Sequence, residues 1–248
     1  MTGHPAAPEG VRPAWYALDR GAWRDYATLL HPPYTAWHLS YVVVGGCLAP
    51  VVAWGRLGAT VAAFGFAVGI GAHALDELQG RPLRTSIPDR VLVVLAVASI
   101  AGACAIGIVG ALVFRPWIAL LVPLGLFLVL AYNLELLGGR FHSDIWFALA
   151  WGGFPALCGY AAVAGGLDVV AVLAATFAVL LSLAQRALSS HVRFLRRHTT
   201  SVTGELELAD GTTEPLDLAR VIAPAERGLR LLTAAIVLLA AALVGFRL

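Results

Sequence analysis

The chain has 248 residues, of which 59% are hydrophobic and only 13% are charged, and its formal net charge is +2. Soluble domains carry about 25% charged residues, so this composition excludes an ordinary soluble protein, and the small net charge gives no argument for a nucleic acid partner. The chain contains no lysine, which excludes a retinal Schiff base. The composition instead predicts a multispanning protein of the lipid bilayer.

The first residues of the chain are polar and rich in tryptophan and tyrosine, without the short apolar core of a signal peptide. We therefore expect residues 1–30 to form a cytoplasmic or interfacial tail and residues 31–248 to form a single transmembrane helical domain. Apolar blocks of span length recur throughout that domain. They cover residues 37–55, 57–75, 90–113, 116–135, 144–165, 167–189 and 229–246.

The longest connection, residues 190–228, contains the stretch "VTGELELADGTTEPLDL". Side chains alternate on both sides of an Asp-Gly pair, which is typical of a β-hairpin. We expect residues 202–208 to pair with residues 213–218, as a lid over a site or as a surface ornament. The predicted fold class is thus all-α, a polytopic bundle of about seven transmembrane helices with one small hairpin.

The arginines are distributed unequally between the two sides of this topology. Of the 17 arginines, all but Arg56, Arg115 and Arg247 lie in the tail or in connections on its side of the membrane. By the positive-inside rule, the tail and these connections are cytoplasmic in a multi-pass protein of the cell membrane. The opposite connections are short and nearly featureless, so we expect any chemistry on the cytoplasmic side.

Ionisable and amide side chains collect at the cytoplasmic ends of the spans. His73, Asp76 and Glu77, at positions i, i+3 and i+4, share one face of a helix. Such groups are costly at membrane depth unless they pair or line a wet cavity, so they indicate a site, although interfacial solvation would account for any one of them. The other candidates are Asn133, Glu135, His142, Asp144, Gln185, Arg186, His191 and Arg193.

Three stretches, in this order and on one side of the membrane, resemble the UbiA superfamily of intramembrane prenyltransferases. They are "HPPYTAWHLSYVVVGGCLAP", "DELQGRPLRTSIP" and "GRFHSDIWFALAWGGFPALCGYAA". The resemblance covers about residues 28–190. It implies a UbiA-like bundle and a prenyltransferase-like transferase that acts on a hydrophobic isoprenoid lipid.

In that family, cytoplasmic acidic motifs bind Mg²⁺ bridged to a prenyl diphosphate, and ionisation leaves an allylic cation in an apolar lateral cavity. The resemblance implies that Asp76 and Glu77 take the metal while Arg81 and Arg140 hold diphosphate. We expect His73 and Glu135 to join the two carboxylates in catalysis, and the substrate to contact Asn133, Gln185, Arg186 and Arg193. The chain departs from the family in having one adjacent acidic pair, no acid at the second motif, and fewer than the usual nine spans.

Two alternatives remain open from the residues. Imidazole with carboxylate suits iron or zinc better than Mg²⁺, so a transition-metal enzyme on the same fold is one of them. Its metal ligands would come from His73, Asp76, Glu77, His142, Asp144 and His191. The other is a membrane protein that binds an isoprenoid or quinone without chemistry.

Overall fold

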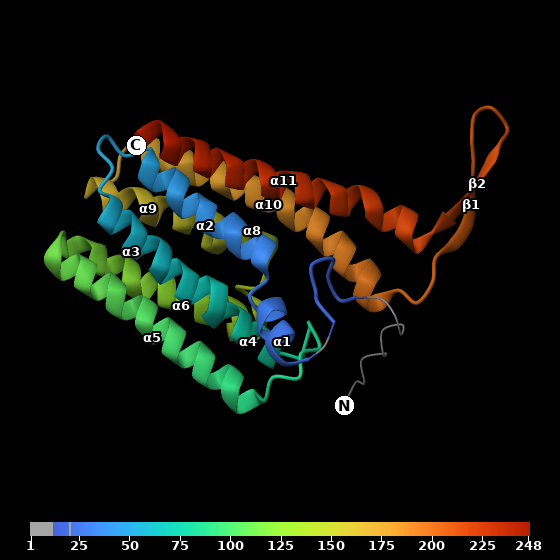
Figure 1. Ribbon diagram of the computed structural model, residues 1–248, viewed down its shortest axis with the longest axis horizontal. Helices are drawn as coiled ribbons and strands as arrows, with labels where there is room; N and C mark the ends of the chain where they lie inside the picture. Colours follow the sequence, from blue (N-terminus) through green and yellow to red (C-terminus); the bar gives the residue numbers. More distant parts are fainter. Residues whose placement is uncertain (1–11, 20) are drawn as a thin grey trace.

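Helices that run back and forth between two ends of the molecule make up most of the computed structural model, and a β-hairpin projects from one end (Figure 1). The structure describes residues 12–19 and 21–248. Its elements are α1 (Ala22–Leu29), α2 (Pro32–Cys47), α3 (Trp54–Phe64), η1 (Gly65–Ala72), α4 (His73–Leu78), α5 (Asp89–Val113), η2 (Pro116–Leu120), α6 (Leu121–Asn133), α7 (Leu136–Gly139), α8 (Asp144–Ala148), η3 (Leu149–Gly153), α9 (Phe154–Ala164), α10 (Val169–His198), β1 (Thr203–Glu207), β2 (Thr213–Asp217) and α11 (Leu218–Arg247).

In the described part of the chain, six helical stretches are long and apolar enough to cross a membrane, which supports an integral membrane protein. They are Trp54–Leu78, Asp89–Val113, Pro116–Asn133, Asp144–Ala164, Val169–His198 and Leu218–Arg247. The π-helical segments η1 and η3 lie within the first and fourth of them. The predicted all-α membrane bundle is therefore confirmed, and six of the seven predicted spans meet these criteria.

The remaining predicted span is α2, which has 16 residues. It is about 24 Å long, shorter than the hydrocarbon core of about 30 Å. Its side chains Trp37, Tyr41 and Val42 are fully buried, because α2 packs along α9 and α11 and is also flanked by α3 (Figure 1). α2 therefore lies inside the bundle, whereas α5 exposes Val94, Val97 and other aliphatic side chains that would face lipid.

Two glycines allow the backbones of α2 and α9 to touch. A methyl group on Gly45 would collide with the carbonyl oxygen of Ala156, and one on Gly159 would collide with the carbonyl oxygen of Val42. Small residues at crossing points are the usual means by which membrane helices approach closely. The pair fixes where α2 crosses α9.

The last turn of α11 is tied to the end of α2. The Arg247 guanidinium donates from Nε to the Cys47 carbonyl and from a terminal nitrogen to the Ala49 carbonyl, both at 2.8 Å. Carbonyls in the last turn of a helix lack partners within the helix, so this arginine satisfies acceptors that would otherwise be unpaired. The C-terminus thereby lies at the opposite end of the bundle from α1 (Figure 1).

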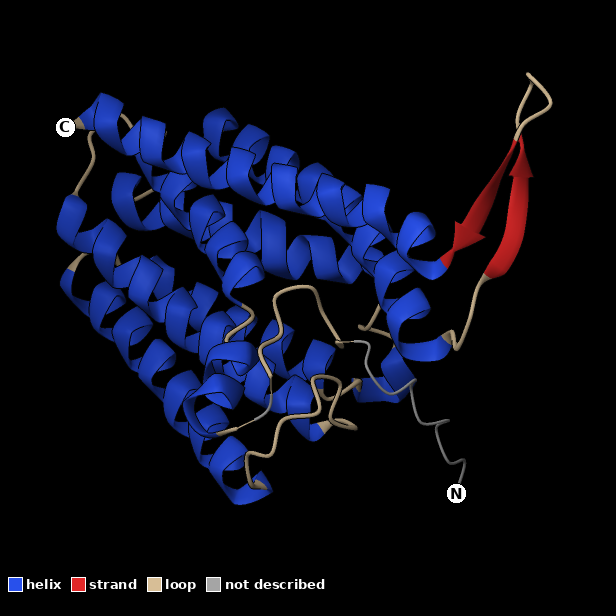
Figure 2. Cartoon of the chain, turned by 45° about the vertical axis from the view of Figure 1, so that its right-hand side comes forward, coloured by secondary structure: helices blue, strands red, loops and turns tan. Residues whose placement is uncertain are grey.

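The helices α10 and α11 extend further than the apolar blocks predict, into the segment expected to be a loop. Their extensions bury Val192 and Leu195 against Ile222 and Leu229, and an ion pair of 2.6 Å joins Arg196 to Glu226. The end of α10 and the start of α11 are amphipathic and carry charged residues, so they do not form an apolar block. The spans predicted from apolar blocks are therefore shorter than these helices. The predicted hairpin is confirmed between these ends, with β1 antiparallel to β2 and projecting from the helices (Figure 2).

Replacing Gly159 with alanine should destabilise the bundle by about 1 to 3 kcal/mol, because the added methyl group forces α2 and α9 apart. Thermal unfolding of the purified protein in detergent tests this, with Gly58→Ala on α3 as the matched control. A methyl group at Gly58 meets no atom within 4 Å. Equal melting temperatures for the two variants would contradict the close crossing.

Candidate functional site

A cavity of about 260 Å³ lies at the end of the bundle where α2 begins and α4 and α6 end, and the side of α10 closes it. We call it the polar cavity. Residues 13–16, before α1, also line it. Its polar lining includes Tyr16, His31, His73, Asp76, Gln185 and Arg193.

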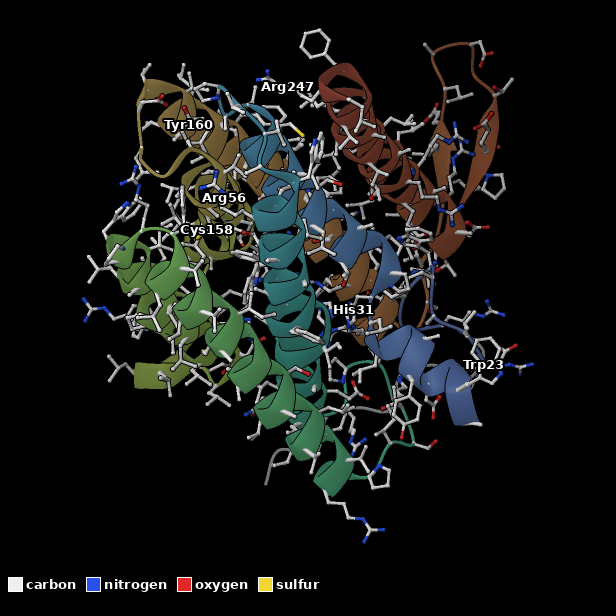
Figure 3. All side chains as sticks on the ribbon, turned by 60° about the vertical axis from the view of Figure 1, so that its left-hand side comes forward. Trp23, His31, Arg56, Cys158, Tyr160 and Arg247 are labelled. Carbon is white, nitrogen blue, oxygen red and sulfur yellow. The ribbon has the colours of Figure 1, made fainter. Side chains whose placement is uncertain are left out.

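His31 joins α1 to α2 and turns its ring into the polar cavity. The proline that follows disfavours the right-handed helical conformation at this position, and His31 instead has a left-handed backbone with φ of 44°. Its Nδ1 is hydrogen-bonded to the Tyr16 hydroxyl at 2.6 Å, and its ring stacks on that of His73 with centroids 4.2 Å apart. In Figure 3, His31 lies toward the interior while Trp23 projects from the outer side of α1.

Burial, followed by the nearby His73 ring and Arg197 guanidinium, lowers the pKa of His31 well below its ordinary value. The ring is therefore neutral at pH 7. Burial also raises the pKa of Tyr16 well above its ordinary value, so the phenol keeps its proton. The Tyr16–His31 pair is thus a hydrogen bond between two neutral groups.

Three further histidines of the polar cavity each direct Nδ1 at a backbone carbonyl. A carbonyl only accepts, so Nδ1 carries the proton in each, and Nε2 of the neutral ring is left as an acceptor. Two of the carbonyls belong to the π-helical segments η1 and η3, and such segments are frequent at functional sites. The pairs are His38 with Trp151 (2.7 Å), His73 with Gly69 (3.2 Å) and His142 with Tyr132 (3.1 Å).

Glu77 is fully buried but organises the loop between α4 and α5. Its carboxylate accepts from the backbone N–H groups of Leu83 and Thr85, at 2.9 and 2.8 Å, and from the Thr85 hydroxyl at 2.8 Å. Arg81 belongs to the same loop, where it donates to the Ile87 carbonyl at 2.5 Å and pairs with Asp89. These two candidates therefore face the loop and not the polar cavity.

The remaining sequence-predicted residues divide between the polar cavity and the surface. Asp144 and Glu135 have side chains that are 60% exposed; Asp144 pairs with Arg186 at 2.6 Å and Glu135 lies 3.9 Å from His142. Arg140 and His191 are exposed and do not line the polar cavity. The structure brings together His73, Asp76, Asn133, His142, Gln185, Arg186 and Arg193.

The predicted metal ligands are dispersed in the structure. No group of three or more His, Cys, Asp or Glu in the described residues is arranged to hold a metal ion. Of the six predicted ligands, His73, Asp76 and His142 line the polar cavity. Mg²⁺ is usually held by one or two carboxylates together with waters and substrate phosphates, and Asp76 is the one predicted carboxylate that the lining offers.

Sequence analysis missed Arg197 and the contribution of the chain before α1. One face of α10 carries Arg186, Arg193 and Arg197, which are spaced by about two turns and then one turn. The helical spacing of these arginines continues past residue 189, where the predicted span ends, and could have extended the predicted helix. No described ion pair includes Arg193 or Arg197. Among the described residues these two guanidinium groups therefore form no ion pair, and Asp76 is the carboxylate of the same cavity lining whose charge acts on both.

A second cavity of about 390 Å³, the apolar cavity, lies between α3, η1, α5, α6 and α9. Phe64, Ile100 and Phe154 are typical of its lining. Arg56 marks the far end, with its guanidinium carbon 3.5 Å from the centroid of the Phe114 ring, opposite the end that holds His31 (Figure 3). Val68 and Trp151 line both cavities, so the two cavities share a wall.

Replacing Glu77 with alanine should cost about 3 kcal/mol of folding stability, because two buried N–H groups of the α4–α5 loop lose their acceptor. Glu77→Gln should cost less, since one amide oxygen can still accept. Chemical unfolding in detergent tests this, with Glu205→Ala on the exposed hairpin as control. A Glu77→Ala protein as stable as the control would contradict the loop role.

Comparisons with protein-family models, with curated proteins and with solved structures find no match to this chain. The resemblance to the UbiA superfamily therefore depends on the three sequence stretches alone.

Proposed function

We propose that the protein is a UbiA-like membrane enzyme that acts on an isoprenoid lipid with a phosphate or diphosphate head group. The observation that carries this proposal is the wall of Val68 and Trp151 shared by the apolar and polar cavities. A ligand that fills both must be amphipathic, with its chain between α3, α5 and α6 and its head group beside α10. Cavities of this size are in the range that binds small molecules.

The head group of such a lipid meets Arg193 and Arg197 in the polar cavity, which supply positive charge and several N–H donors. In prenyl transfer the C–O bond of the allylic diphosphate breaks and its electron pair leaves with the diphosphate. The allylic cation then lies beside Trp151, whose ring face favours cations. An acceptor forms the new bond to carbon and releases a proton, for which the Asp76 carboxylate in the lining of the polar cavity is the base.

Bond breaking and proton transfer in this proposal use side chains of the chain itself, among which Asp76 is the one predicted acidic ligand that lines the polar cavity. The same single carboxylate favours the alternative function, in which the protein binds the isoprenoid without reaction. Turnover separates the two: release of diphosphate from a prenyl diphosphate supports the enzyme, whereas stoichiometric binding without release supports the binding protein.

The proposal also places the polar cavity on the cytoplasmic side of the cell membrane, because of the arginine distribution. Labelling of single introduced cysteines in intact cells with a membrane-impermeant maleimide tests this. Glu207→Cys on the hairpin should stay unlabelled, and Val51→Cys, which is 78% exposed at the opposite end, should be labelled. The reverse pattern would contradict the orientation, and the parent protein controls for its native cysteines.

The chain-binding role is tested by filling the apolar cavity. Ala103→Phe on α5 adds a ring to the lining and should weaken binding of geranylgeranyl diphosphate by tenfold or more, since the isoprenoid loses its space. Ala105→Phe on the same helix is the matched control, because Ala105 is exposed and outside the lining. Binding is measured by displacement of a fluorescent isoprenoid from protein in nanodiscs. Equal affinities would contradict the proposed function.

A further inference from the structure

Buried polar atoms without partners gather at the polar cavity. In the described residues, four buried side-chain atoms make no hydrogen bond, and all four belong to residues that line this cavity. An unpaired buried donor or acceptor costs about 1 to 3 kcal/mol, so such atoms point to a ligand where they converge. They are Trp15 Nε1, His31 Nε2, Gln185 Oε1 and Arg197 Nε.

These atoms define the chemistry of the missing group. Arg197 Nε and Trp15 Nε1 can only donate, so the group needs acceptor oxygens; Gln185 Oε1 can only accept, so the group also needs a hydroxyl hydrogen. Gln185 is 2% exposed and has no described hydrogen bond to satisfy its oxygen. A phosphate that retains one proton has both properties, and its charge suits the unpaired Arg193 and Arg197.

Residues 12–19, the chain segment before α1, lie against the polar cavity. We call this segment the strap. Tyr16 bonds to His31, and the Leu18 N–H donates to the Thr28 hydroxyl at 3.0 Å. Arg196 donates to the Arg12 carbonyl at 3.2 Å. The Tyr16 ring also contacts that of Tyr34, and residues 13–16 form one wall of the polar cavity.

Trp15 is the strap residue placed to contact a bound group. Its ring is packed beneath the Arg230 guanidinium, with 4.8 Å between the guanidinium carbon and the ring centroid. Its N–H lies near the Tyr34 hydroxyl without the geometry of a normal hydrogen bond. The indole N–H is therefore a donor available to a ligand oxygen.

We propose that the strap is part of the head-group site: it closes over a protonated phosphate group that accepts from Trp15 and Arg197 and donates to Gln185. This inference rests on the proposed function for the lipid source of that group. Binding then adds contacts between the strap and the ligand, so the bound group holds the strap closed. The tail before α1 is thus a binding element and not only an interfacial lead-in.

Hydrogen exchange of the strap amides, read by mass spectrometry with the full chain in nanodiscs and EDTA present, tests the inference. The probes are geranylgeranyl diphosphate, geranylgeranyl phosphate, geranylgeraniol and inorganic diphosphate. The phosphorylated lipids should slow strap exchange by tenfold or more, and geranylgeraniol should leave it unchanged. Protection by inorganic diphosphate at a similar concentration would support the same site with a free oxyanion as its ligand.

Trp15→Phe keeps an aromatic ring at this position but replaces the indole by the smaller phenyl and removes the N–H, so it should weaken binding of the phosphorylated probes about tenfold. Trp23→Phe is the matched control, because Trp23 is 67% exposed on α1, and it should bind as the parent does. Arg197→Gln should weaken the same probes and leave geranylgeraniol unaffected.

The outcomes separate this inference from the proposed function. If the phosphorylated lipids bind and Ala103→Phe weakens them, but strap exchange and the affinity of Trp15→Phe match the parent, the strap inference is overturned and the proposed function stands. If inorganic diphosphate protects the strap while no lipid probe binds, the strap inference stands and the proposed function fails. Protection that requires Mg²⁺ would overturn the inference as stated.

Discussion

The contact of the α2 and α9 backbones at Gly45 and Gly159 is the constraint on which the rest of the arrangement depends. α2 is short and mostly buried among its neighbours, so its position is set by them and not by lipid. Because α2 carries His38, and His31 precedes its first turn, the crossing also determines where these rings meet the His73 ring of α4 and the Trp151 carbonyl of η3. A packing contact between small residues thereby positions a polar site about two turns away.

The polar cavity combines fixed groups with unpaired ones. Histidines on α2, on α4 and before α8 are held by backbone carbonyls, which fixes their proton positions. Arg193 and Arg197 form no ion pair with a described residue, and together they bring more positive charge to the polar cavity than the one Asp76 carboxylate in its lining offsets. An anion held in this way sits in a low-dielectric site, where each donor is worth more than it is in water.

The spans and the hairpin could be predicted because each leaves a local signal, either a long apolar block or alternation about an Asp-Gly pair. The site was predicted only in part. Asp76 and Glu77 are adjacent and hence about 100° apart on the helix, so one faces the polar cavity while the other meets a loop whose path no local pattern gives. Arg197 was missed because the apolar block that predicts the sixth span ends at residue 189. Trp15 was missed because the strap reaches the polar cavity only through tertiary packing, which no local sequence pattern reveals.

The hydrogen bonds from Arg247 to the end of α2 affect the order in which the helices can pack during synthesis. Cys47 and Arg247 are 200 residues apart in the sequence, yet among the described residues the carbonyls of Cys47 and Ala49 receive their donors from Arg247. A helix too short to span the bilayer alone therefore keeps these carbonyls unpaired until α11 has been made and inserted. A nascent chain halted before α11 would leave α2 exposed along one side.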